Sequence, residues 1–151
     1  MNKIIIGIDP GEHTGIAILD QNKKFHLSTK TFWGAIEILN SYPAGTLKVY
    51  IEDPGQNKPV FDHFKIPVEF SRKVGDKLNY IGRIAQNIGE NKRMAKLLIE
   101  YCIVRGIEYY AMKPTRKSGT KLDIRLFQKY TGFYGRCSEH ARDAAMLIVG
   151  R

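Results

Sequence analysis

Ile4-Ile5-Ile6-Gly7-Ile8-Asp9-Pro10-Gly11 is the stretch around which the rest of the chain is organised. Four isoleucines in five positions are typical of a β-strand that is buried on both faces. Asp9 ends this strand, and an ionised carboxylate in a dry core is costly unless it is paired or holds a metal ion. Pro10-Gly11 then turns the chain, and a second strand begins at Gly15. Asp9 is therefore predicted to lie at the rim of a central sheet, with a simple turn-capping role as the alternative.

The composition indicates one domain with a polyanionic partner. A chain of 151 residues is long enough to bury its own core, so residues 1–151 are interpreted as a single domain. The 24 Lys and Arg residues exceed the 15 Asp and Glu residues by a net charge of +9. An excess of this size favours nucleic acid as a partner first, and an anionic membrane second.

Three features of the sequence favour a cytoplasmic location. No apolar run approaches the length of a membrane span, and the first residues lack a signal-peptide pattern. Cys102 and Cys137 have no CxxC spacing and no matching His pair, which is typical of free thiols in a reducing compartment. We therefore expect a cytoplasmic protein with no membrane partner, either nucleoid-associated or phage-encoded and acting in the host cytoplasm.

Hydrophobic spacing predicts an α/β protein with a mixed five-stranded sheet flanked by helices. The expected strands cover residues 4–9, 15–19, 25–31, 47–52 and 107–112. The third strand follows a polar turn and should be antiparallel to the second, whereas the fourth follows a short helix at 33–40 and should be parallel to the first.

The remaining segments are expected to be one long loop and three helices. Residues 54–80 are the least regular part, and their mixed aromatic and basic side chains either grip nucleic acid or fold the loop back onto the body. A helix through 93–102 should stop at Gly106. Thr120 and Asp123 predict a capping box for a helix that ends at Gly132 and buries Leu122, Leu126, Phe127 and Tyr130. Ser138 should cap the last helix, which buries Ala141, Ala144, Ala145 and Ile148.

Four polar side chains fall at positions where this topology brings distant segments together. Asp9 and Glu52 both end strands that are expected to be parallel, so they should meet at one carboxyl edge of the sheet. His140 and Asp143 are three residues apart on the last helix and share one face of it. Hard divalent cations such as Mg²⁺ need several oxygen ligands, and two such ions about 3.5–4 Å apart can activate a water and stabilise a leaving oxygen on phosphate.

The chain resembles the RuvC-type Holliday junction resolvases of the RNase H-like nuclease superfamily. Three blocks carry the resemblance: residues 6–11 with Thr14-Gly15, residues 50–52, and residues 140–144. The resemblance implies an RNase H-like fold and a structure-selective endonuclease that cuts four-way DNA junctions. The family's four metal-binding positions map onto Asp9, Glu52, His140 and Asp143, and imply two Mg²⁺ ions per site, with Mn²⁺ able to substitute.

The resemblance also implies further site residues and a partner. Basic residues near the scissile phosphate correspond best to Lys113 and Lys121, with Lys117 as a rival. A symmetric homodimer is expected, because paired cuts on a nearly two-fold junction are most simply made by two identical sites, and the helix at 92–105 is its candidate surface. In the family a helix with a base-disturbing aromatic follows the second acid closely. Here Asp53-Pro54-Gly55 and a long loop follow Glu52, which fits a phage or otherwise divergent resolvase.

Other function classes remain open at this point. A different RNase H-like nuclease would use the same ligands on another nucleic acid. A basic module that grips branched DNA without cutting it needs no metal. An actin-like ATPase module also opens with a strand and an Asp-x-Gly turn, but that architecture uses two related domains and gives no role to His140 or Asp143.

Overall fold

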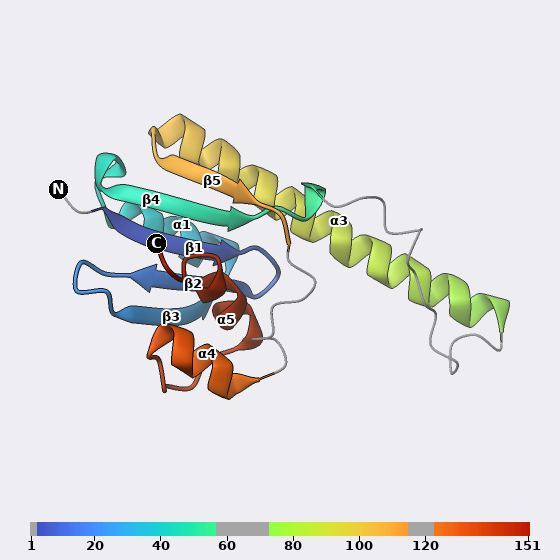
Figure 1. Cartoon of the computed structure of the whole chain (residues 1–151). Helices are drawn as coiled ribbons and strands as arrows, with labels where there is room; N and C mark the ends of the chain where they lie inside the picture. Colours follow the sequence, from blue (N-terminus) through green and yellow to red (C-terminus); the bar gives the residue numbers. More distant parts are fainter. Residues whose placement is uncertain (1–2, 57–72, 115–122) are drawn as a thin grey trace.

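The computed structural model describes residues 3–56, 73–114 and 123–151 and shows one central sheet with helices on both sides (Figure 1). The strands are β1 (Ile4–Asp9), β2 (Thr14–Leu19), β3 (Phe25–Lys30), β4 (Leu47–Glu52) and β5 (Glu108–Met112). The α-helices are α1 (Phe32–Asn40), α3 (Val74–Arg105), α4 (Ile124–Thr131) and α5 (Glu139–Met146), with short 3₁₀ turns η1 (Ala44–Thr46) and η2 (Pro54–Gln56).

The sheet has the strand order β3-β2-β1-β4-β5, so β1 is its central strand. β1 pairs with β2 and β2 with β3 in antiparallel fashion, whereas β4 is parallel to β1 and β5 is parallel to β4. The predicted α/β class is therefore confirmed: the sheet is mixed, has five strands and is flanked by helices.

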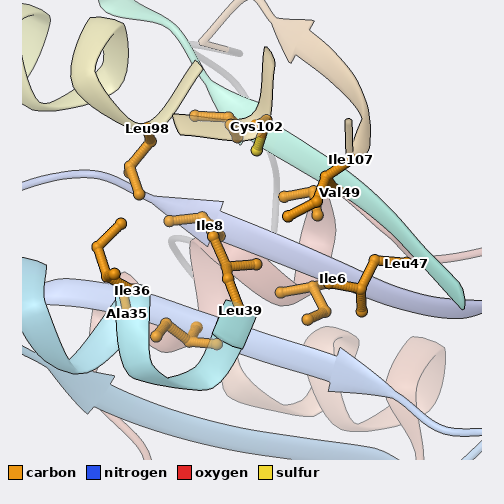
Figure 2. Close-up of a cluster of buried hydrophobic side chains, with 12 residues drawn as sticks. Ile6, Ile8, Ala35, Ile36, Leu39, Leu47, Val49, Leu98, Cys102 and Ile107 are labelled. Atoms are coloured by element: carbon orange, nitrogen blue, oxygen red, sulfur yellow. The ribbon is translucent and has the colours of Figure 1, made fainter. Parts of the chain in front are cut away.

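Two hydrophobic cores lie on opposite faces of this sheet. On one face, side chains of α1 and α3 pack against β1 and β4, and Figure 2 shows Ile6 and Ile8 among them. On the other face, α4 and α5 contribute Phe127, Ala144 and Ala145 to a second cluster. The central strand is covered on both sides, which confirms the prediction made from its run of isoleucines.

Gly7 lets α5 approach the sheet at backbone distance. A Cβ atom built on Gly7 would lie 2.1 Å from the carbonyl oxygen of Ala144 and 3.2 Å from a methyl group of Ile148. No side chain fits there, so the single interruption in the isoleucine run is the place where α5 crosses the central strand.

Two expectations about helix limits are wrong. Residues 74–80 belong to α3 and not to a loop; Gly75 lowers helix propensity, but no proline interrupts the stretch. The next helix begins at Ile124 because Asp123 is itself the N-cap, accepting a hydrogen bond from the backbone N–H of Arg125 at 2.8 Å. Tyr130 is 52% exposed and does not join the buried face, whereas Phe127 does. Thr120, Leu122 and the loop residues 57–72 lie outside the described residues.

Both cysteines are free thiols, as expected. Burial raises the pKa of the Cys102 thiol to about 11, which favours the unreactive protonated form. Among the helices that the structure describes, none combines the length and the apolar character that a membrane crossing requires.

The close approach at Gly7 predicts a large stability cost for the smallest possible side chain. Gly7→Ala forces the Ala144 carbonyl away from β1 and should lower the free energy of unfolding by about 2–3 kcal/mol or more. Gly45→Ala is the matched control, because a Cβ at Gly45 meets nothing within 4 Å. Urea denaturation of both variants checks this, and equal stabilities would contradict the packing described.

Candidate functional site

Asp9 is a buried carboxylate at the carboxyl end of the central strand. It is 9% exposed and, with Thr14, makes up the buried polar residues of the described chain. The turn after it is closed by the Thr14 hydroxyl, which donates to the carbonyl oxygen of Gly11 at 2.9 Å. A carboxylate in such a place is stable only with a compensating partner.

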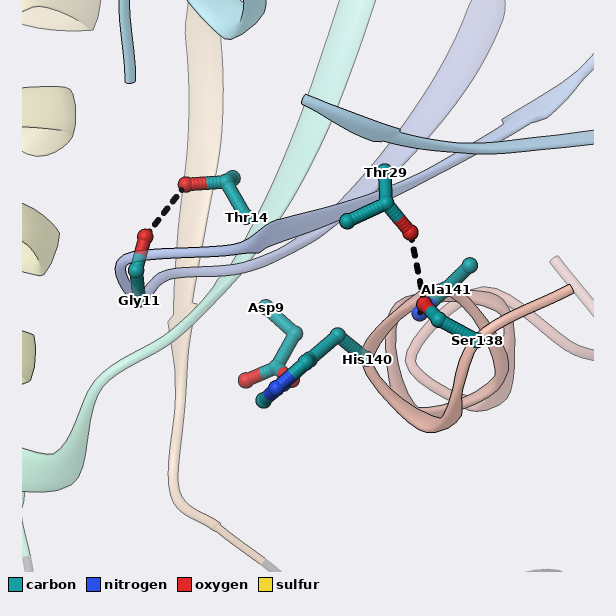
Figure 3. Close-up of polar contacts among 7 residues, drawn as sticks. All are labelled: Asp9, Gly11, Thr14, Thr29, Ser138, His140 and Ala141. Carbon is teal, nitrogen blue, oxygen red and sulfur yellow. Dashed lines mark hydrogen bonds and ion pairs between the residues drawn. The ribbon is translucent and has the colours of Figure 1, made fainter. Parts of the chain in front are cut away.

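His140 supplies a partner for Asp9 from the first turn of α5. Its Nδ1 lies 2.9 Å from Oδ2 of Asp9, and Figure 3 shows the ring against the carboxylate. When Nδ1 carries the proton and donates it to Asp9, Nε2 keeps a lone pair that is available to a metal ion. The two residues are 131 positions apart in sequence, so the tertiary fold alone creates this pair.

The start of α5 is fixed against the sheet by two contacts. Ser138 is the N-cap, as predicted, and its hydroxyl accepts from the backbone N–H of Ala141 at 3.1 Å. The same hydroxyl lies 2.6 Å from the Thr29 hydroxyl of β3 (Figure 3). These bonds set the direction in which α5 presents His140.

Gly15 allows the first turn of α5 to lie directly on β2. A Cβ atom at Gly15 would lie 2.0 Å from the carbonyl oxygen of His140. Gly15 is also the β2 residue paired with Asp9 across the β1–β2 ladder. The bare backbone beside Asp9 is therefore what brings His140 within hydrogen-bonding reach.

Glu52 lies on the strand next to Asp9, at the same edge of the sheet. Ile8 and Ile51 are register partners in the parallel β1–β4 ladder and both face the α1–α3 core. The next residue of each strand, Asp9 and Glu52, therefore faces the α5 side. Glu52 is half-buried, and the register places it at the same edge of the sheet as Asp9, as the parallel pairing predicted.

The positions of Asp143 and the basic residues are defined by the elements that carry them. Asp143 is half-buried on α5, one turn after His140, as the helical spacing predicted. Lys113 is exposed and directly follows β5, whose last residue pairs with Glu52. Lys121 and its rival Lys117 lie outside the described residues.

The donor set is of the kind that Mg²⁺ and Mn²⁺ accept, three carboxylates and one imidazole. Among residues 3–56, 73–114 and 123–151, however, no three His, Cys, Asp or Glu side chains are grouped as metal ligands. Asp9 and His140 are hydrogen-bonded to each other. Glu52 lies at the same edge of the sheet as Asp9, and Asp143 lies on the same helix as His140. Binding by all four would therefore require side chains to rotate from the positions described.

Sequence reasoning missed the residues that support this site. Gly15 and the Thr29–Ser138 contact fix α5, yet nothing in their local spacing shows that a distant helix crosses there. Comparison with other proteins adds nothing to these geometric observations: no protein-family model matches the chain, and no curated protein does.

Proposed function

We propose that this protein is a metal-dependent endonuclease with an RNase H-like fold that cuts branched DNA, four-way junctions foremost. The observation that carries the proposal is the buried carboxylate of Asp9, held by His140 at the edge where Glu52 also ends its strand. The mixed five-stranded sheet flanked by helices is compatible with that fold.

The residues have distinct roles in this proposal. Asp9, Glu52 and Asp143 would contribute carboxylate oxygens, and His140 an imidazole nitrogen, to Mg²⁺ or Mn²⁺ ions, two per site. Such ions supply charge stabilisation for phosphate oxygens and activate water. Lys113, at the end of β5 beside Glu52, would hold a phosphate oxygen, and Lys121 is the second candidate for that role.

The charge of the chain supports a nucleic-acid substrate. A net charge of +9 favours a polyanion, and a nuclease needs phosphodiesters at the same edge as its carboxylates. A non-cutting DNA-binding module would leave the buried Asp9–His140 pair without a role.

Cleavage of a labelled four-way junction with Mg²⁺ or Mn²⁺ is the first test. Wild type should nick the junction, whereas Asp9→Asn should bind it with similar affinity and cut it at least about a hundredfold more slowly, because one carboxylate ligand is lost. Asp76→Asn, an exposed acid in the first turn of α3, is the matched control and should cut like wild type.

Each other outcome of this assay favours a different class. Cutting by Asp9→Asn at the wild-type rate contradicts the metal-site assignment. Binding without cutting by wild type favours the binding module, turnover of ATP favours the actin-like module, and cutting confined to unbranched substrates favours another RNase H-like nuclease.

His140 is tested by metal binding as well as by cutting. His140→Ala removes one proposed ligand and should weaken Mn²⁺ binding, measured by titration calorimetry, by about tenfold or more, since even outer-shell partners are worth ~10–100-fold. His140→Asp restores an oxygen ligand and should retain Mg²⁺-dependent cutting. Identical Mn²⁺ affinities for wild type and His140→Ala would show that His140 is not a ligand.

We also propose that two copies pair through α3, because paired cuts require two sites. In the predicted surface at 92–105, Ala95, Leu98 and Cys102 are buried in the monomer core, while Ile103 and Val104 are exposed. The amino-terminal half of α3 is a more extended surface, because it projects beyond the sheet (Figure 1). It carries an apolar seam with alternating four- and three-residue spacing, the heptad pattern of a coiled coil: Val74, Leu78, Ile81, Ala85 and Ile88.

Exposure and glycine placement support this seam as the pairing surface. Val74 and Leu78 are 73% and 64% exposed. Gly75, Gly82 and Gly89 recur every seven residues beside the seam, and a Cβ at any of them meets nothing within 4 Å. A second helix can therefore approach this side closely.

Sedimentation of seam variants tests the pairing. Wild type should sediment as a dimer, and Leu78→Lys as a monomer, because pairing would bury two unpaired ammonium groups. Val104→Lys is the control: Val104 is 84% exposed on the same helix but outside the seam. A monomeric wild type, both free and on junction DNA, would defeat the proposal.

A further inference from the structure

The sheet face that carries Asp9 and Glu52 continues along β4 and β5, where no described helix covers it (Figure 1). Alternate residues of a strand share a face, so Tyr50 and Lys48 lie on the same side as Glu52. The β4–β5 register sets them beside Tyr110 and Glu108. In Figure 1, α4 and α5 lie in front of β1, β2 and β3, whereas no described helix lies in front of β4 and β5.

Two tyrosines form a fixed aromatic surface on this face. The rings of Tyr50 and Tyr110 are stacked, with centroids 4.9 Å apart and planes inclined by 14°. Tyr50 is buried beneath, while Tyr110 is 42% exposed and donates its hydroxyl hydrogen to Glu108 at 2.8 Å. An exposed, rigid aromatic ring is a surface on which a nucleobase can stack.

Cations surround the aromatic stack. The Lys48 ammonium lies 4.9 Å from the centre of the Tyr110 ring, and the Arg151 guanidinium lies 5.0 Å from that of Tyr50. Farther from the candidate site, a hollow of about 250 Å³ is lined by three lysines, Lys3, Lys23 and Lys48. Along β4 the four residue steps from Glu52 to Lys48 span about 13 Å, so the hollow is several nucleotides away from Asp9.

The carboxylates near the hollow do not neutralise all of its positive charge. Glu108 pairs with Lys3 and lies 3.7 Å from Lys48, and Asp20 lines the hollow while bonded to His26 at 3.0 Å. Contacts to Lys3 and Tyr110 lower the pKa of Glu108, and the contact to Tyr50 raises that of Lys48. Lys23 also donates to the main-chain oxygen of Arg151 at 2.9 Å. The cationic side chains of Lys3, Lys23, Lys48 and Arg151 thus outnumber the two side-chain carboxylates, Glu108 and Asp20, and leave positive charge for a further anion.

We propose that a nucleic-acid strand leaving the candidate site runs along β4 and β5, stacks a base on Tyr110 and then enters the hollow. There its phosphates would contact Lys48 of β4, Lys3 before β1 and Lys23 in the β2–β3 turn. We call these four residues the β4–β5 track. The proposal rests on the proposed function, since the track begins at Glu52, the last residue of β4 and a residue of the candidate site. The track would bind the substrate at a distance from the reacting phosphate and fix the direction of the strand.

Salt-dependent DNA binding tests the lysines. Fluorescence anisotropy of a labelled four-way junction, in EDTA and between about 50 and 200 mM salt, measures binding without cutting. Replacing Lys3, Lys23 and Lys48 by Gln should reduce the slope of log K against log salt by about two to three, because each phosphate contact contributes about 0.9. Replacing Lys92, Arg93 and Lys96 of α3 by Gln is the control with the same change of charge, and its slope should change less.

Single-strand binding tests the aromatic surface. Tyr110→Leu should lower affinity for a labelled single strand about five-fold or more, while Tyr110→Phe, which keeps the ring, should bind like wild type. Trp33→Leu is the control, since Trp33 is 72% exposed on α1, which packs on the opposite face of the sheet. Thermal unfolding confirms that each variant is folded, and the lysine variants report on the track independently of the Tyr110 change.

These experiments distinguish failure of the track proposal from failure of the proposed function. Equal slopes for the two triple variants, or equal affinities of Tyr110→Leu and Trp33→Leu, overturn the track even if wild type cuts junctions. A wild type that neither binds nor cuts DNA overturns the proposed function, and the track with it.

Discussion

The close approach of α5 to β1 and β2 is the contact on which the rest of the structure depends. At Gly7 and Gly15 the sheet has no side chain on the α5 side, and carbonyl groups of Ala144 and His140 occupy the space that a Cβ would fill. This contact seals the second core above the central strand. It also sets His140 against Asp9, so the same packing that stabilises the fold compensates the buried acid.

The sheet topology explains why the candidate site lies at one edge. β1 and β4 are parallel neighbours, so their last residues, Asp9 and Glu52, end at the same edge. α5 starts at that edge because Ser138 is bonded to Thr29 of β3. Three separate segments therefore bring polar side chains to the same edge of the sheet, while the β4–β5 surface beside it carries aromatic and basic groups.

Much of the fold was predictable because its signals are local. The isoleucine run identified β1, strand-end residues identified the edge, and Ser138 identified the start of α5. The limits of α3 and α4 were not predictable for physical reasons. Gly75 disfavours a helix that forms nonetheless, and both Thr120 and Asp123 are good N-caps, so sequence alone does not choose between them.

The placement of the candidate residues on strands and helix was predictable, but the contacts between them were not. The Asp9–Glu52 adjacency follows from parallel pairing, and the spacing of His140 and Asp143 follows from the helix. The role of Gly15 depends on which helix crosses it, and the Tyr50–Tyr110 stack depends on the β4–β5 register. Such features are set by contacts between distant segments, which no local pattern encodes.

Anomalous diffraction from a crystal grown with Mn²⁺ is the most direct test of the central claim, that the carboxyl edge of β1 and β4 is a metal centre. The account predicts anomalous peaks bounded by Asp9 and Glu52, with His140 and Asp143 of α5 completing the ligand shell. Peaks only elsewhere, for example beside Asp20 or Glu108, with the Asp9–His140 hydrogen bond intact and no ion at the edge, would contradict it.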